Sequence, residues 1–280
     1  MNAPKLSLIV TTYNRADALK AVLEALARQA AAGSYEVLIA DDGSQPETAA
    51  LIETYAVKYP VPLIHVWQED VGFRAAAARN RAAQQASGEY LIFLDGDCLP
   101  LPDFCARHRR LMEAGWCVAG SRVLLSEAFT RSLLASNDPA HILHWGKADW
   151  RAAVRRKDAN KATARRRWPL GPLRKLGGHR WQRVRTCNLG VWRSDFEAVN
   201  GFDETFSGWG YEDSDFAVRL LRHGVRVKDG RFAIPVLHLW HKENDRSKQP
   251  ENWARFEATL NGDHIRARQG LDQYQPSNPD

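Results

Sequence analysis

Strand-like and helix-like segments alternate over the first 95 residues of this 280-residue chain, and this pattern constrains the fold most strongly. The strand-like segments are short and apolar, whereas the segments between them carry leucine or alanine at helical spacing. Strands that alternate with helices pair in parallel, with helices on both faces of the sheet. The sequence therefore predicts an α/β fold with a mostly parallel central sheet. The predicted strands are 6–12, 35–40, 62–66 and 90–94, and the predicted helices are 16–29, 47–59 and 75–86.

Polar side chains gather where three of these strands end. The clusters are Thr11-Thr12-Tyr13-Asn14, Asp41-Asp42 and Asp95-Gly96-Asp97. Ligands of parallel sheets bind beyond the carboxyl ends of the strands. We therefore expect the three clusters to converge on one crevice.

The Asp95-Gly96-Asp97 run is a candidate metal site. An isolated match of this kind is more often only a turn after a strand. Here the strand context and the other strand-end acids favour two carboxylates that share Mg²⁺ or Mn²⁺, cations that also bind substrate phosphates. The chain lacks the glycine patterns of dinucleotide-binding and P-loop proteins.

A Gly-Trp-Gly-Tyr-Glu-Asp-Ser-Asp run stands at the start of a predicted helix over 211–223. Acids in a first helical turn favour the helix dipole, but this does not explain a tryptophan between two glycines. A carboxylate here can deprotonate an acceptor hydroxyl, and the tryptophan can stack on a sugar. We predict catalytic roles for Glu212 and Asp213, and substrate contacts for Trp209, Gly210 and Asp215.

Two histidines, His238 and His241, follow an apolar segment of the region 225–239, which we predict to form strands. A lone histidine is more often a hydrogen-bonding residue than a ligand. A pair three residues apart, in a chain with an Asp-Gly-Asp candidate, favours a metal role, because imidazole suits Mn²⁺.

Positive charge is concentrated in residues 147–185, which hold fourteen Lys/Arg and two acids, a net of +12 within a chain of net +6. A charge run of this kind is usually a solvated loop. Here Trp150, Trp168 and Trp181 lie among the cations, which favours contact with an anionic membrane surface or a phosphorylated lipid-linked glycan. Residues 148–164 are predicted to be partly helical.

We expect a cytoplasmic protein, peripheral on the inner face of the cytoplasmic membrane. The apolar runs are too short for a membrane-spanning helix, and the N-terminus does not read as a secretory signal. The cysteines are not spaced as CxxC, so we expect reduced thiols that bind no metal.

Several motifs together resemble the inverting family 2 glycosyltransferases with a galactosyltransferase-like C-terminal region. They are SLIVTTYNR, ADDGS, GFR leading to RN, FLDGDCLP, NLG, GFDE, GWGYEDSDFAVRL and HLWH, in that order. The match covers most of residues 5–125 and 185–250. Each motif alone is unspecific, but their order and spacing are highly specific.

The resemblance implies a GT-A fold and a nucleotide-sugar donor, with UDP as the expected carrier. It places Thr11 and Asp42 at the nucleoside, and Tyr13 belongs to the same donor-binding cluster. Arg79 is expected near the diphosphate. Asp97 resembles the metal-ligating acid of the DxD motif, and Asp95 beside it reaches the ribose or the metal.

The resemblance also implies that Asp213 is the catalytic base and Trp209 the lid tryptophan. Tyr211 replaces the second glycine of that motif, a change that would stiffen the lid. The metal-binding histidine maps onto His241, with His238 at the neighbouring contact position. The implied reaction is a single displacement, with a glycan or lipid-linked glycan of surface polysaccharide or lipopolysaccharide synthesis as acceptor.

These expectations divide one GT-A domain into three parts. Residues 1–125 form a nucleotide-sugar-binding half, 126–185 a basic insertion that is partly mobile or membrane-facing, and 186–280 an acceptor-binding and catalytic half. The sugar, the acceptor and the oligomeric state are not readable from the sequence.

Other readings remain open at this point. A nucleotidyltransferase would share the crevice and the acids, but it usually has a glycine-rich basic loop after the first strand, which residues 11–15 lack. A nucleic-acid- or anion-binding protein would use residues 147–185 and leave the acids and histidines without a purpose. An inactive GT-A module that binds a partner is disfavoured by the intact acids and histidines.

Overall fold

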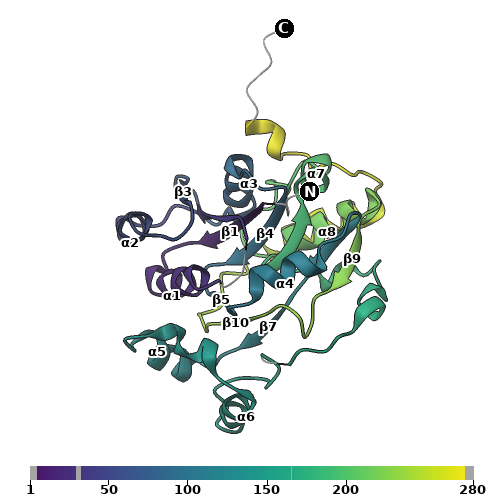
Figure 1. Cartoon of the computed structure of the whole chain (residues 1–280). Helices are drawn as coiled ribbons and strands as arrows, with labels where there is room; N and C mark the ends of the chain where they lie inside the picture. The colour runs from purple at the N-terminus through teal and green to yellow at the C-terminus, as the bar shows by residue number, and fades with distance from the viewer. Residues whose placement is uncertain (1–4, 30–32, 165, 275–280) are drawn as a thin grey trace.

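A computed structural model describes residues 5–29, 33–164 and 166–274 of the chain (Figure 1). Its centre is a seven-stranded sheet. In spatial order the strands are β3 (Leu63–Trp67), β2 (Tyr35–Asp41), β1 (Leu6–Thr12), β4 (Tyr90–Asp95), β8 (Asn188–Trp192), β6 (Trp116–Ala119) and β9 (Arg226–Asp229). The first four strands pair in parallel, as predicted.

Strand β8 is the exception to the parallel arrangement. It runs antiparallel to both β4 and β6, whereas β6 and β9 pair in parallel. Since β8 and β9 come from the C-terminal third of the chain, the sheet is built from both ends of the sequence. The predicted mostly parallel sheet is therefore confirmed, with one antiparallel strand in its middle.

Helices cover both faces of this sheet because its strands are apolar on both faces. Successive strand residues point to opposite faces, so Leu8 and Val10 join one buried cluster while Ile9 joins the other. The first cluster includes α1 (Ala16–Ala27), α2 (Pro46–Ala56) and α4 (Phe104–Leu111). The second includes α3 (Ala75–Gln85), α7 (Arg193–Ala198) and α8 (Glu212–Arg222).

A second sheet of three short strands lies beside the first. Its order is β5 (Cys98–Pro100), β10 (Pro235–His238) and β7 (Ser121–Leu124). Strand β10 pairs antiparallel with β5, and His238 stands opposite Cys98 in the register. This pairing brings the predicted histidines to the Asp-Gly-Asp turn from a point 140 residues later in the chain.

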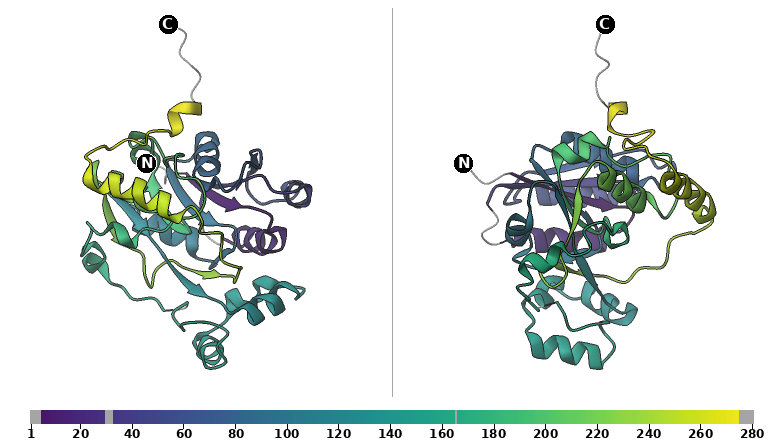
Figure 2. Two further views of the ribbon diagram at one scale, coloured as in Figure 1. Left: turned by 180° about the vertical axis from the view of Figure 1, so that it is seen from behind. Right: turned by 90° about the vertical axis from the view of Figure 1, so that its right-hand side faces the viewer.

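Residues 126–185 form the basic segment. Its first part, which contains α5 (Glu127–Leu134), η1 (Pro139–His144) and α6 (Lys147–Arg155), forms the basic lobe at the end of the molecule opposite α3 and η4 (Leu271–Tyr274), as Figures 1 and 2 agree. Its later helices, η2 (Gly171–Lys175) and η3 (Trp181–Arg183), contact β9 of the main sheet. Residues 148–164 are partly helical, as predicted, and the helix ends at Arg155. Lys157 adopts φ 63°, and the Asp158 N–H bonds back to the Ala153 carbonyl at 2.8 Å, which ends the helix.

Of the three tryptophans predicted to face a membrane, one is buried inside the protein and a second is partly buried. Trp150 has no exposed surface and meets Trp145 edge-on at 5.2 Å between ring centroids. Trp181 packs on Phe256 of α9 (Gln249–Asn261) at 4.9 Å. Only Trp168 of the three is strongly exposed, at 48%. The interpretation of Trp150 as an interfacial residue is therefore wrong, whereas that of Trp181 and Trp168 stays a prediction.

No helix in the described parts of the chain combines the length and the apolar character that crossing a bilayer requires.

Replacing Trp150 by alanine tests the packing of the basic lobe. Loss of a fully buried indole should lower the free energy of unfolding by about 3–5 kcal/mol, because it removes transfer free energy and leaves a cavity. Trp168→Ala is the control, and it should cost less than half as much because its ring is half exposed. Denaturant titration measures both, and equal losses would contradict the burial of Trp150.

Candidate active site

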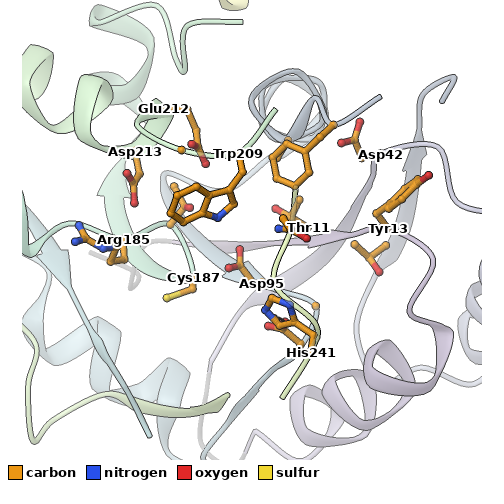
Figure 3. Close-up of a pocket in the computed structure, with 18 of the residues that line it drawn as sticks. Thr11, Tyr13, Asp42, Asp95, Arg185, Cys187, Trp209, Glu212, Asp213 and His241 are labelled. Atoms are coloured by element: carbon orange, nitrogen blue, oxygen red, sulfur yellow. Dashed lines mark ion pairs between the residues drawn. The ribbon is translucent and has the colours of Figure 1, made fainter. Parts of the chain in front are cut away.

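One cavity of about 570 Å³ opens at the carboxyl ends of β1 and β4, between the start of α8 and the end of β10 (Figure 3). Twelve of the thirteen predicted site residues line it. They are Thr11, Tyr13, Asp42, Arg79, Asp95, Asp97, Trp209, Gly210, Glu212, Asp213, His238 and His241. The expected convergence of the strand-end clusters is thus observed.

One end of the cavity is formed by Thr11, Tyr13 and Asp42. The Asp42 carboxylate accepts hydrogen bonds from Gln68 Nε2 at 2.6 Å and from the Arg74 N–H at 2.7 Å. Burial raises the pKa of Asp42 even though both bonds oppose the shift. The Tyr13 hydroxyl donates to Asp70 at 2.9 Å, and 45% of the Tyr13 surface is exposed. This end offers a fixed carboxylate and an accessible aromatic ring.

Arg79 links the strands to the acidic helix. From the buried face of α3, its guanidinium donates to Thr11 Oγ1 at 3.0 Å, to Asp95 Oδ1 at 3.2 Å and to Glu212 Oε1 at 3.2 Å. These bonds join the ends of β1 and β4 to the start of α8. The residue predicted to lie near a diphosphate therefore also holds three other site residues in place.

Negative charge is crowded around Asp95. Burial, together with the charges of Asp97 and Glu212, raises the pKa of Asp95 to about 6, although Arg79 opposes the shift. Carboxylates that repel one another in a partly buried cavity are stabilised by a bound cation. The electrostatics of this part of the cavity therefore favour a metal ion.

Asp97 lies close to both histidines, of which His238 ends β10 and His241 follows it by three residues. Its Oδ1 is 3.7 Å from His238 Nε2, and its Oδ2 is 3.4 Å from His241 Nε2. Adjacent ligands of an octahedral cation with bonds of about 2.1 Å lie roughly 3 Å apart, so this spacing needs only a small contraction. Each histidine can therefore share a divalent cation with Asp97, although among the described residues the possible ligand atoms that all lie within 4.8 Å of one another are those of Asp97, Cys98 and His238.

The state of each histidine also fits a metal site. Burial lowers the pKa of His238, which keeps its imidazole neutral. His241 Nδ1 lies 2.8 Å from the Lys242 carbonyl, which can only accept, so Nδ1 carries a proton and Nε2 is the ring nitrogen that faces Asp97. The Cys98 thiol is also near Asp97, but burial raises its pKa strongly and keeps it protonated. Oxygen and nitrogen ligands are thus favoured over sulfur.

The acids of α8 face the metal candidates across the cavity. Burial and the charge of Glu212 raise the pKa of Asp213 to about 6, while Arg185 and the Ser214 hydroxyl oppose the shift. A carboxyl group with this pKa is ionised at neutral pH and still basic enough to accept a proton.

Trp209 projects into the cavity in Figure 3, and the Arg246 guanidinium lies over its ring at 4.7 Å. Glycines with positive φ flank it, at 76° for Gly208 and 109° for Gly210. Tyr211 also has a positive φ of 72°, and its ring stacks on Phe256 at 5.5 Å. This stacking anchors one end of the segment to α9.

Asp215 does not lie in the cavity, so we withdraw its predicted substrate contact. It is fully buried, pairs with Arg219 at 2.8 Å and accepts from Thr259 Oγ1 at 2.7 Å. Two helical residues turn the side chain by about 200°, so Asp213 and Asp215 face opposite sides of α8. Helical phase could have separated them from the sequence alone.

Sequence reasoning missed several basic residues in the cavity wall. Arg15, Arg122, Arg185 and Lys242 all line it, as does Cys187. Arg122 stands on β7, a four-residue strand that carries no periodic signal. Arg185 and Cys187 come just before the Asn-Leu-Gly motif, whose position could have indicated them.

Comparison with known proteins gives two family matches that follow one another along the chain. The model of glycosyl transferase family 2 matches residues 7–168, and the model described as the N-terminal domain of galactosyltransferase matches residues 177–242.

Two relatives and one solved structure show the extent of the similarity. A validoxylamine A glucosyltransferase of Streptomyces hygroscopicus is 31% identical over 91% of this chain and 61% of its own length. A hyaluronan synthase of Pasteurella multocida is 28% identical over 85% of this chain and 24% of its own. A mannosyltransferase from Pyrobaculum calidifontis, solved with GDP-mannose and Mn²⁺, superposes with a TM-score of 0.57 at 20% identity, over 87% of this chain and 59% of its own.

Asp215→Ala tests the division of roles on α8. It should lower the free energy of unfolding by about 3–5 kcal/mol, because it leaves the buried Arg219 charge unpaired. Asp213→Asn is the control and should be neutral or stabilising, since the raised pKa of Asp213 shows that folding disfavours its charge. Denaturant titration near pH 7.5 compares them, and a larger loss for Asp213→Asn would contradict this division.

Proposed function

The chain belongs to glycosyltransferase family 2 and has the GT-A fold, and from this premise we propose that it transfers a sugar from a nucleotide-sugar to a hydroxyl of a glycan, with inversion. The observation that carries the proposal is the cavity itself. Asp97 and its two histidines occupy one wall, and Glu212 and Asp213 face them from the start of α8. Candidate ligands for a diphosphate-binding cation and a candidate catalytic base thus lie on opposite walls of the same cavity.

The donor occupies the end of the cavity formed by Thr11, Tyr13 and Asp42 in this proposal. The Asp42 carboxylate suits a nucleoside N–H or hydroxyl donor, and the exposed Tyr13 ring suits a nucleobase face. Asp95 is placed for a ribose hydroxyl or the cation. We propose UDP as the carrier from the sequence resemblance, while the mannosyltransferase with the same fold binds GDP-mannose.

Asp97, His238 and His241 hold the cation, Mn²⁺ or Mg²⁺, in this proposal. A divalent ion there would neutralise the charge that develops on the departing diphosphate. Arg79 keeps Asp95 and Glu212 in position around that charge.

Asp213 acts as the base. As the acceptor oxygen forms its bond to the anomeric carbon, its proton passes to the Asp213 carboxylate, and the bond between the anomeric carbon and the diphosphate oxygen breaks on the opposite face. Glu212 keeps the pKa of Asp213 high, and Trp209 covers the sugar face. No covalent bond to the enzyme forms.

The acceptor in this proposal is a glycan or lipid-linked glycan of surface polysaccharide or lipopolysaccharide synthesis. One relative is a hyaluronan synthase by name, and its similarity covers 85% of this chain. Residues 1–125 would bind the donor, and 186–280 the acceptor.

The exposed Trp168, Leu173 and Leu176 lie among basic residues and support contact of the 126–185 segment with an anionic membrane surface. Co-sedimentation with vesicles tests this contact.

Asp97→Ala should abolish metal-dependent donor binding. A ligand that binds only the folded state raises Tm, so a matching nucleotide-sugar should stabilise the wild type with Mn²⁺ and not with chelator. The variant should show no Mn²⁺-dependent shift. Asp103→Ala, outside the cavity, is the control and should keep the shift. Equal stabilisation of Asp97→Ala and wild type would remove the metal site from the proposal.

Asp213→Asn should lower kcat by about 10²–10⁴-fold, because the amide cannot accept the proton, while the donor-induced Tm shift persists. In the wild type, kcat/KM should fall as pH drops through about 6, where Asp213 becomes protonated. Release of nucleoside diphosphate measures both. If Asp213→Asn keeps its activity and Glu212→Gln loses it, Glu212 is the base instead.

A further inference from the structure

A second cavity, of about 260 Å³, lies in the basic lobe and belongs to no part of the proposed transfer site. Its lining consists of Lys147, Arg151, Ala162, Arg166, Arg167 and Trp168. Four of these six residues are cations that converge on one small space.

The charges of this cavity are largely uncompensated. Among the described residues, Lys147, Arg151 and Arg166 form no ion pair, whereas Arg167 pairs with Asp103 at 3.3 Å. The two acids of residues 147–185 are used elsewhere, because Asp149 accepts from the Gly146 N–H at 2.8 Å and Asp158 pairs with Arg156 at 2.8 Å. Converging cations without counter-charges create a strong local attraction for an anion.

Helix stability does not explain the positions of these cations. Lys147 is the first residue of α6, and Arg151 follows it at i+4 on the same face. Positive side chains near a helix N-terminus oppose the helix dipole, which instead favours an anion at that point. The dipole and the side chains therefore attract the same kind of ligand.

Trp168 gives the cavity an aromatic wall. Its ring packs on Phe232 at 4.6 Å, while the Arg166 guanidinium lies over it at 5.8 Å and 48% of the residue remains exposed. A fixed, exposed ring beside cations suits the apolar face of a sugar that carries an anionic group.

Backbone pairing links this cavity to the catalytic one. The Asn160 N–H bonds to the Leu124 carbonyl at 3.0 Å, next to the end of β7, whose Arg122 lines the catalytic cavity. Lys161 follows, and burial together with the charges of Arg122 and Arg231 lowers its pKa. A row of positive charge thus leads from the catalytic cavity towards the second one.

We propose that the cavity formed by Lys147, Arg151, Arg166, Arg167 and Trp168 is a phosphate-binding site that holds a phosphate ester of the acceptor. Guanidinium groups match phosphate oxygens in pairs, and several cations suit a doubly charged group. The volume is below that of pockets for drug-sized ligands, about 300–1,000 Å³, and suits one phosphorylated sugar. Assignment of the phosphate to the acceptor rests on the proposed glycosyl transfer, whereas phosphate binding does not.

Calorimetry with glucose 6-phosphate in the presence of chelator tests the site, with glucose as the comparison. The wild type should bind the phosphate ester and not glucose. The double variant Lys147→Gln, Arg151→Gln should bind at least about tenfold more weakly, because it removes two charged hydrogen-bond donors to the phosphate. Arg155→Gln, Lys157→Gln removes the same charge from exposed positions of the same helix region and should bind as the wild type does.

Absence of phosphate-ester binding, or equal weakening in the two double variants, would overturn the proposal. Vesicles with phosphatidic acid form a second arm. If both double variants lose vesicle binding equally and neither loses glucose 6-phosphate selectively, the cations act as a membrane face and no discrete site exists. The Mn²⁺-dependent donor shift should persist in both variants, so failure here is distinguishable from failure of the transfer site.

Discussion

The buried guanidinium of Arg79 is the contact on which the rest of the site depends. It reaches the sheet edge because the alanines of α3 let the helix pack closely on β1 and β2. There it offsets the repulsion among Asp95, Glu212 and Asp213, which would otherwise drive the start of α8 away from β4. Burial, together with the repulsion that remains, keeps the pKa values of Asp95 and Asp213 raised. Negative charge is therefore concentrated where the cation and the proton of the acceptor hydroxyl are proposed to bind.

The metal candidates depend on a second constraint, the register of the small sheet. Strand β10 pairs with both β5 and β7, and just after it the Leu239 N–H donates to the Asp97 carbonyl at 2.9 Å. Main-chain pairing therefore fixes His238 relative to Asp97 before any ligand binds. Preorganisation of this kind removes the ordering cost from the binding step. Helix α8, which carries the acids, and strand β10, which ends at His238, come from consecutive parts of the sequence and meet at this cavity.

The sequence predicted the strands of the parallel half because their burial on both faces produces continuous apolar runs, as in Leu6–Thr12. The position of the cavity could be predicted because polar side chains gather at the carboxyl ends of these strands. Of the small sheet, the strand-forming region that contains β10 was predicted, but β5 and β7 were not, because they have only three and four residues and pair with a strand more than one hundred positions away. Asp215 was misplaced because composition, without helical phase, does not separate the two sides of α8. Trp150 was misplaced because charge around a residue in sequence does not determine its burial in space.

A crystal structure with UDP and Mn²⁺, phased to reveal manganese by its anomalous scattering, tests the central claim most directly. The account predicts a manganese peak bonded to Asp97 and at least one of His238 and His241, with the diphosphate on the same ion and the nucleoside beside Asp42. A manganese peak away from Asp97, or ordered UDP outside this cavity, would contradict it.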